Sequence, residues 1–134
     1  MSRHVIVVED DPHNATLFRK VLEKRLGCEV SLTESPEEIL RWARAGNVNL
    51  IVLDVSLAHS KWEGRPVGGV EICQMLKNDP LTAMIPVMLA TAHAMRGDAE
   101  ALLAESGADD YVSKPILDHA SFVAQAASLM EQAA

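Results

Sequence analysis

The sequence predicts an α/β protein built on a doubly wound, five-stranded parallel sheet with helices on both faces. Aliphatic runs alternate five times with segments whose hydrophobic residues recur at helical spacing, which is typical of repeated strand–helix units. The first and third runs, at residues 5–8 and 50–53, are continuously aliphatic, as expected for strands buried on both faces. Right-handed crossovers leave few topologies, and the doubly wound strand order 2-1-3-4-5 places the first and third strands side by side.

Capping and stop residues separate the expected elements. Asp11 is placed to cap the first helix, and Gly27 is placed to end it. Ser35 and Glu38 have the spacing of a capping box before the second helix, and Asp118 precedes the last helix. The expected strands cover residues 4–9, 28–34, 49–54, 85–91 and 109–113. The expected helices cover about 12–26, 36–46, 70–78, 98–106 and 119–130, with a long loop at 55–68.

Length and composition indicate one globular domain. The 134 residues suit a single domain, so we expect residues 1–134 to form it with no attached output domain. The net charge of −7 argues against a nucleic-acid-binding surface, because phosphate backbones need a basic footprint. No apolar stretch has transmembrane length, and we expect no signal peptide before the first strand. Cys28 and Cys73 lack metal-ligand spacing, so we expect both thiols to be free in a reducing cytoplasm. We also expect no membrane partner.

Three carboxylates follow two of the expected strands. Glu9 and Asp10 follow the aliphatic run of the first strand, and Asp54 follows that of the third. Because reactive groups of parallel sheets lie just beyond the carboxyl ends of the strands, these three side chains should meet. Three negative charges at close range imply a cation or a shifted pKa, and ligation by oxygen alone suits Mg²⁺. Asp11 is expected to cap a helix instead, and the five histidines lack the spacing of a zinc site.

Four short motifs lie at the ends of expected strands. They are VVEDDP at 7–12, LD at 53–54, ATA at 90–92 and GADDYVSKP at 107–115. With these motifs, the chain resembles the receiver domain of response regulators in two-component signalling over nearly its whole length. The resemblance implies a flavodoxin-like (βα)5 fold and a phosphoacceptor that takes its phosphoryl group from a phosphohistidine. It further implies a histidine kinase or histidine phosphotransfer protein as partner, a switched interaction with a downstream protein, and scope for a phosphorylation-dependent dimer.

The resemblance assigns chemical roles to the acidic residues. Asp54 becomes the phosphoacceptor, and the domain catalyses only its own phosphorylation and dephosphorylation. Asp10, Asp54 and the backbone carbonyl of Ser56 are implied ligands of Mg²⁺, with Glu9 holding the ion through water. A carboxylate is a weak nucleophile, but phosphoryl transfer depends mostly on positioning and charge neutralisation.

The resemblance also assigns roles around the phosphate. Lys114 is implied to pair with Asp54 at rest and with the phosphoryl group afterwards, aimed by a cis bond to Pro115. Thr91 is implied to offer its hydroxyl to the phosphoryl group, and Tyr111 to turn inward when Thr91 moves. Residues implied in phosphate binding or in tuning the access of water are Ala92, Ser56 and His93.

The loop at 55–68 departs from the family pattern, because it is about seven residues longer than usual. One interpretation is a tolerated surface insertion, which costs little closure entropy. Another is a partner contact, since loops beside a reactive site often carry function and a tryptophan between cations suits an interface. The residues of that second interpretation are Lys61, Trp62 and Arg65.

Three alternative functions are open on sequence grounds. A receiver fold can act as an unphosphorylated binding scaffold. A haloacid-dehalogenase-like phosphatase needs a second acid two residues after its nucleophile, where this chain has Ser56. A flavodoxin needs a phosphate-binding loop after the first strand, where this chain has the acidic residues 9–11. The sequence names neither the kinase nor the downstream target, and it does not set the lifetime of the phosphate.

Overall fold

The computed structural model describes residues 3–92 and 96–132, and it contains one five-stranded parallel sheet. The sheet strands are β1 (His4–Val8), β2 (Glu29–Thr33), β3 (Leu50–Asp54), β6 (Val87–Thr91) and β7 (Asp110–Ser113). The helices are α1 (Pro12–Leu26), α2 (Pro36–Arg44), α3 (Gly69–Asn78), α4 (Arg96–Ser106) and α5 (His119–Gln132). The strand order is β2-β1-β3-β6-β7, which is 2-1-3-4-5 when only the strands of this sheet are counted. The expected topology is therefore confirmed.

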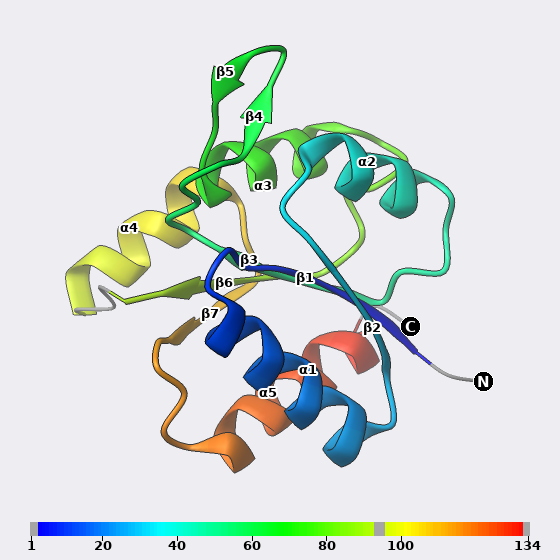
Figure 1. Ribbon diagram of the computed structural model, residues 1–134, viewed down its shortest axis with the longest axis vertical. Helices are drawn as coiled ribbons and strands as arrows, with labels where there is room; N and C mark the ends of the chain where they lie inside the picture. The colour runs from blue at the N-terminus through cyan, green and yellow to red at the C-terminus, as the bar shows by residue number, and fades with distance from the viewer. Residues whose placement is uncertain (1–2, 93–95, 133–134) are drawn as a thin grey trace.

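Helices cover both faces of the sheet (Figure 1). Helices α1 and α5 lie on one face, while α2, α3 and α4 lie on the other. Side chains of β1 alternate between the two cores, because successive strand residues point to opposite faces. Val5 and Val7 pack with α1 and α5, where Phe18 and Phe122 meet at a ring-centroid distance of 5.4 Å. Ile6 and Val8 point to the opposite face of the sheet and pack with α2 and α3, so β1 is buried on both sides.

A short antiparallel hairpin interrupts the segment that we expected to be loop. It consists of β4 (Lys61–Trp62) and β5 (Arg65–Pro66), and it extends beyond α2 and α3 in Figure 1. Glu63 and Gly64 form its turn with positive φ angles of 51° and 79°, the combination that a type I′ turn requires. The expectation of a plain loop at 55–68 was wrong here, because two-residue strands are too short to show periodicity.

The helix starts confirm most of the expected caps. Asp11 accepts a hydrogen bond from the N–H of His13 at 2.8 Å, as an N-cap of α1 should. Ser35 accepts from the N–H of Glu38 at 3.3 Å, which is one half of the expected capping box. The other half is relayed, because the N–H of Ser35 donates to Thr33 Oγ1 at 3.0 Å. The Thr33 hydroxyl in turn donates to Glu38 Oε1 at 2.6 Å, which makes the β2–α2 turn a closed hydrogen-bonded unit.

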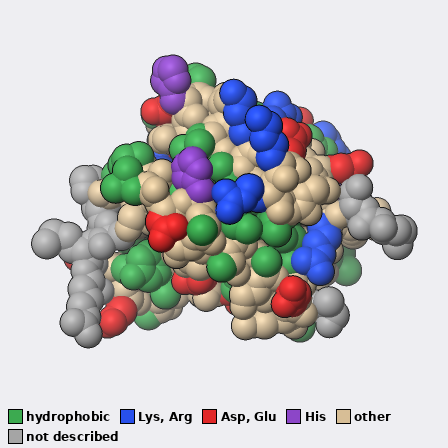
Figure 2. Space-filling view, turned by 90° about the horizontal axis from the view of Figure 1, so that it is seen from below, with side chains coloured by type: hydrophobic (Ala, Val, Ile, Leu, Met, Phe, Trp, Pro, Cys, Tyr) green, Lys and Arg blue, Asp and Glu red, His purple; other side chains and the backbone are tan. Residues whose placement is uncertain are grey.

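Charge is unevenly distributed over the surface despite the net charge of −7. Helix α1 exposes Lys20, Lys24 and Arg25. Figure 2 views the molecule from the side of α1 and α5, and Lys and Arg side chains gather in the upper part of this view. Among the described residues, no helix is long and apolar enough to cross a membrane.

Candidate functional site

The parallel pairing of β1 with β3 brings three carboxylates together. Val8 is in register with Leu53, so the next residues of both strands emerge at the same edge of the sheet. Glu9, Asp10 and Asp54 each place a carboxylate oxygen within 4.8 Å of the others. Glu9 and Asp54 are buried, and Asp10 is half-buried. The site is thus an acidic group set into the edge of a packed sheet.

Lys114 reaches this group from the end of β7. Its Nζ lies 2.9 Å from Glu9 Oε1 and 3.1 Å from Asp54 Oδ1, and its side chain is only 12% exposed. The peptide bond to Pro115 is cis, and the N–H of Lys114 donates to the carbonyl of Thr91 at 2.9 Å. Burial alone would lower the pKa of Lys114, but its bonds to Glu9 and Asp54 raise that pKa above its usual value. Lys114 is therefore an ammonium group held between two carboxylates.

Glu9 is a buried carboxylate whose ionisation is disfavoured. Its side chain is 1% exposed, and its Oε2 accepts the N–H of Asp11 at 3.1 Å. Burial and a hydrogen bond with Asp54 raise the pKa of Glu9 to about 7, although Lys114 acts in the opposite direction. One ammonium therefore does not balance three carboxylates, and the group is suited to hold a further cation.

Asp10 is oriented by the segment that follows β3. Its Oδ2 accepts the N–H of Ala58 at 2.9 Å, and this bond is the largest cause that lowers the pKa of Asp10. A carboxylate has several acceptor positions, so this bond leaves capacity for a metal ion. Side-chain patterns do not predict this contact, because every residue except proline carries a backbone amide donor.

Asp54 lies in a tightly packed backbone environment. Its Oδ1 accepts the N–H of Ser56 at 3.1 Å, and its side chain is 2% exposed. Gly69, the first residue of α3, packs directly against the backbone carbonyl of Asp54, and a Cβ there would also lie 2.9 Å from Val55 Cα. Only glycine permits this approach, which a search for reactive side chains could not reveal.

The remaining predicted site residues lie on β6, β7 and the connection after β6. Thr91 is buried at the end of β6, and Ala92 is exposed directly after it. Tyr111 is half-buried and in register with Leu89, so Tyr111 and Thr91 lie on the same face of the sheet. His93 falls outside the described residues, and its proposed tuning role stays a prediction.

A second potential ligand group adjoins the first. Asp10, Glu34 and His59 place donor atoms within 4.8 Å of one another, and His59 Nδ1 lies 3.9 Å from Glu34 Oε1. The histidine spacing in the sequence did not indicate this grouping, because it is formed by tertiary contact. Its members are more open than the first group, with the His59 side chain 81% exposed.

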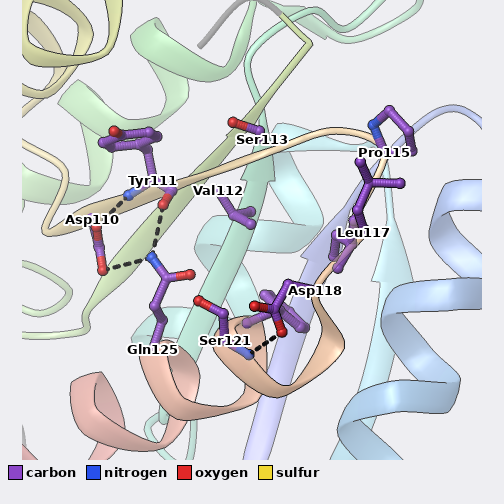
Figure 3. A pocket seen from close by; sticks show the side chains of 11 residues that line it. Asp110, Tyr111, Val112, Ser113, Pro115, Leu117, Asp118, Ser121 and Gln125 are labelled. Carbon is purple, nitrogen blue, oxygen red and sulfur yellow. Dashed lines mark hydrogen bonds between the residues drawn. The ribbon is translucent and has the colours of Figure 1, made fainter. Parts of the chain in front are cut away.

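A hollow of about 370 Å³ lies between β7 and α5 (Figure 3), and Glu9, Asp10 and Asp54 are not among the residues that line it. Gln125 of α5 lies along one side, where its Nε2 donates to Asp110 Oδ2 at 3.1 Å and to the Tyr111 carbonyl at 3.0 Å. Asp118 accepts the N–H of Ser121 at 3.0 Å, which confirms its expected role as a helix cap. This opening therefore belongs to the β7–α5 surface and not to the acidic group.

Comparison with known proteins agrees with the class that the fold and site define, a receiver-type signalling domain. A family model for the response regulator receiver domain matches residues 5–126. The chain belongs to this family, the response regulator receiver domains of two-component signalling. It is 38% identical over 116 residues to the polar-differentiation response regulator DivK of Brucella ovis, with 87% of each chain covered. The resemblance inferred from the four motifs is confirmed.

Solved structures show the same fold. A putative response regulator from Chloroflexus aurantiacus superposes with a TM-score of 0.83 at 24% identity, covering 98% of this chain and 99% of that one. The receiver domain of a sensor histidine kinase from Pseudomonas aeruginosa gives a TM-score of 0.79 at 24% identity, with 98% and 99% covered. That receiver has a magnesium ion coordinated in its active site cleft.

Proposed function

We propose that this domain takes a phosphoryl group from a phosphohistidine onto Asp54 and thereby switches its binding to a partner protein. The observation that carries the proposal is the position of Asp54, buried 3.1 Å from the Lys114 ammonium and beside two further carboxylates. An Asp54 oxygen forms the new bond to phosphorus while the bond from phosphorus to the histidine nitrogen breaks. The imidazole leaves with that electron pair, so no oxidant or reductant is needed.

The donor set fits Mg²⁺, which prefers carboxylate and carbonyl oxygens and keeps several waters. Asp10, Asp54 and the backbone carbonyl of Ser56 would hold the ion, with Glu9 acting through water. When bound, the ion supplies positive charge to the phosphoryl oxygens. The close approach of three carboxylates to a single ammonium supports this assignment, because their donor oxygens lie within 4.8 Å of one another. The magnesium ion in the Pseudomonas aeruginosa receiver supports it independently.

The residues of the chain itself position and neutralise the transferred group. The Lys114 ammonium pairs with a phosphoryl oxygen after transfer, as a charge-assisted hydrogen bond. The Thr91 hydroxyl and the backbone beside Ala92 lie next along the sheet edge and receive the other oxygens. Movement of Thr91 would be passed to Tyr111 on the same sheet face, which shifts the population between two surface conformations.

The phosphodonor is a histidine kinase or a histidine phosphotransfer protein, and the transfer takes place in the cytoplasm.

The β4–β5 hairpin is a second candidate contact for a partner protein, because Lys61 and Arg65 are exposed on it. Trp62 is half-buried against the core on the α2–α3 side, so its ring already stabilises the fold. A partner contact there would rest mainly on the two cations and on the hollow between Trp62 and Met75.

The test is labelling by a small phosphodonor such as acetyl phosphate, with and without Mg²⁺, measured by intact mass. The native protein should gain one phosphoryl group only when Mg²⁺ is present, and Asp54→Asn should gain none. Asp11→Asn is the matched control, because asparagine caps a helix as well as aspartate and Asp11 is outside the acidic group. It should be labelled like the native protein.

Two results would contradict the proposal. Equal labelling of the native protein and Asp54→Asn would remove Asp54 as acceptor. Absence of labelling and of a thermal shift with beryllofluoride and Mg²⁺ would instead favour a receiver fold used as a binding scaffold.

A further inference from the structure

The segment between β3 and the hairpin reaches back over the acidic group. The N–H of Ala58 holds Asp10 Oδ2 at 2.9 Å. Glu9 and Asp54 are each paired with the Lys114 ammonium, and Asp10 accepts its strongest backbone hydrogen bond from this loop amide. The orientation of the Asp10 carboxylate therefore depends on where the loop lies.

Ser60 fastens that loop on two sides. Ser60 is only 3% exposed, and its Oγ donates a hydrogen bond to the carbonyl oxygen of Glu34 at 2.6 Å. Its own carbonyl accepts the N–H of Val67 at 3.0 Å, which closes the base of the β4–β5 hairpin. The hydroxyl thus ties the inserted segment to the β2–α2 turn, while the backbone ties it to the hairpin.

The anchor point of Ser60 is itself well ordered by hydrogen bonds. Glu34 lies between Thr33 and Ser35, whose bonds to each other and to Glu38 close the β2–α2 turn. Ser60 is two residues from Ala58, so a shift at Ser60 must move the amide that holds Asp10. A buried hydroxyl bonded to a backbone carbonyl is costly to delete, because the carbonyl then loses its partner.

We propose that Ser60 is a positioning residue for the metal ligand Asp10, acting through the Ala58 amide. The inference deepens the proposed function and rests on it, because it concerns the same Mg²⁺ site. Groups that orient a metal ligand typically change metal affinity by about tenfold or more when removed. Ser60→Ala should therefore weaken Mg²⁺ binding by about tenfold and leave the reacting groups intact.

The experiment compares Ser60→Ala with Ser106→Ala in the full chain. Ser106 is also buried, at the end of α4, and its hydroxyl also bonds backbone groups, those of Leu103 and Ala108. The Mg²⁺ dissociation constant is measured by calorimetry, and labelling by acetyl phosphate is measured over a range of Mg²⁺ concentrations. We expect Ser60→Ala to raise the dissociation constant and the half-saturating Mg²⁺ concentration. Its labelling rate at saturating Mg²⁺ should match the native rate, and Ser106→Ala should bind Mg²⁺ as the native protein does.

A second variant acts at the other end of the contact chain. Ala58→Pro removes the N–H that bonds Asp10, at an exposed position where no cavity is created. It should raise the Mg²⁺ requirement in the same direction, and it tests the inference even if Ser60→Ala does not fold. Native affinity in Ala58→Pro would overturn the role of the amide.

The outcomes separate the two proposals. If the native protein binds no Mg²⁺, both the proposed function and the positioning role are overturned. If the native protein binds Mg²⁺ and Ser60→Ala binds it equally well, only the positioning role is overturned. The same holds if Ser106→Ala weakens binding as much as Ser60→Ala, because the effect is then one of general stability.

Discussion

The acidic group and the β4–β5 hairpin are connected by residues 55–60, but they are held in place in different ways. Glu9 and Asp54 extend from β1 and β3, whose aliphatic residues are fully buried and paired in a fixed register. The hairpin has two-residue strands and one tight turn, and it is attached through Ser60 and the half-buried Trp62. A one-residue slip of a buried strand would expose its whole core face, whereas a hairpin of this size has few contacts of its own and depends on those two attachments.

This difference separates two contributions to one site. The sheet decides which charges meet, because the strand order alone brings the acids and Lys114 to one edge. The inserted segment decides how one of those charges is oriented, because its Ala58 amide holds Asp10. Substitutions of side chains carried by the sheet should therefore abolish or strongly slow labelling. Substitutions in the inserted segment should change Mg²⁺ affinity and leave the labelling rate at saturating Mg²⁺ unchanged.

The largest effect is expected at the sheet-borne cation. Lys114→Met removes the ammonium that lies against Asp54, and the labelling rate by acetyl phosphate at saturating Mg²⁺ should fall by about a hundredfold. The physical reason is that a preorganised charge in a buried site stabilises the transferring group more than a solvated one does. The measurement is the initial labelling rate followed by intact mass.

Lys77→Met is the matched control for that loss. Lys77 is also largely buried, and its Nζ bonds Asp109 Oδ2 at 2.8 Å and the Ile85 carbonyl at 2.9 Å. Its removal should lower the free energy of unfolding without changing the labelling rate of the folded protein. A comparable loss of rate in both variants would show that stability, and not charge at Asp54, determines the rate.

An intermediate effect is expected from pH, through Glu9. Its pKa is raised to about 7, so the folded, metal-free protein carries a proton there at pH 6 and has lost most of it at pH 8. Protons and Mg²⁺ compete for the same carboxylate, so Mg²⁺ affinity should fall by about tenfold from pH 8 to pH 6. Calorimetry at each pH measures this, and Glu9→Gln should flatten the dependence because the amide does not titrate.

The sequence predicted the sheet-borne part of the site because strand patterns are explicit. Continuous aliphatic runs predicted the strands. The acids that follow these runs were therefore expected at one edge of the sheet, and they are Glu9, Asp10 and Asp54. The strand order itself came from the class of topology, and the structure confirms it. Lys114 was assigned by resemblance, and the structure places its ammonium between two of these acids.

The contacts of the insertion were missed for a different physical reason. The bond from Ala58 to Asp10 uses a backbone amide, which every residue except proline carries, so no residue type indicates it. The relay from Ser35 through Thr33 to Glu38 replaced half of a capping box, although the sequence motif was present. Such contacts depend on loop coordinates, which local patterns do not determine.

The smallest effects are expected from the same substitution, glycine to alanine, made once beside Asp54 and once in the hairpin turn. Gly69→Ala would place a Cβ against the carbonyl oxygen of Asp54 and 2.9 Å from Val55 Cα, so the backbone of Asp54 must shift. We expect a loss of about 2 kcal/mol in the free energy of unfolding, together with slower labelling. Urea unfolding and the acetyl phosphate assay measure the two effects.

Gly64→Ala provides the contrast in the hairpin turn. Gly64 has a φ of 79°, which costs an alanine about 1 kcal/mol, but a Cβ there meets nothing within 4 Å. The labelling rate should stay at the native value, because the turn is not in contact with Asp54. If Gly64→Ala slowed labelling as much as Gly69→Ala, the tip of the hairpin would have to control the acceptor, and the division between a sheet that sets the chemistry and an insertion that tunes it would be wrong.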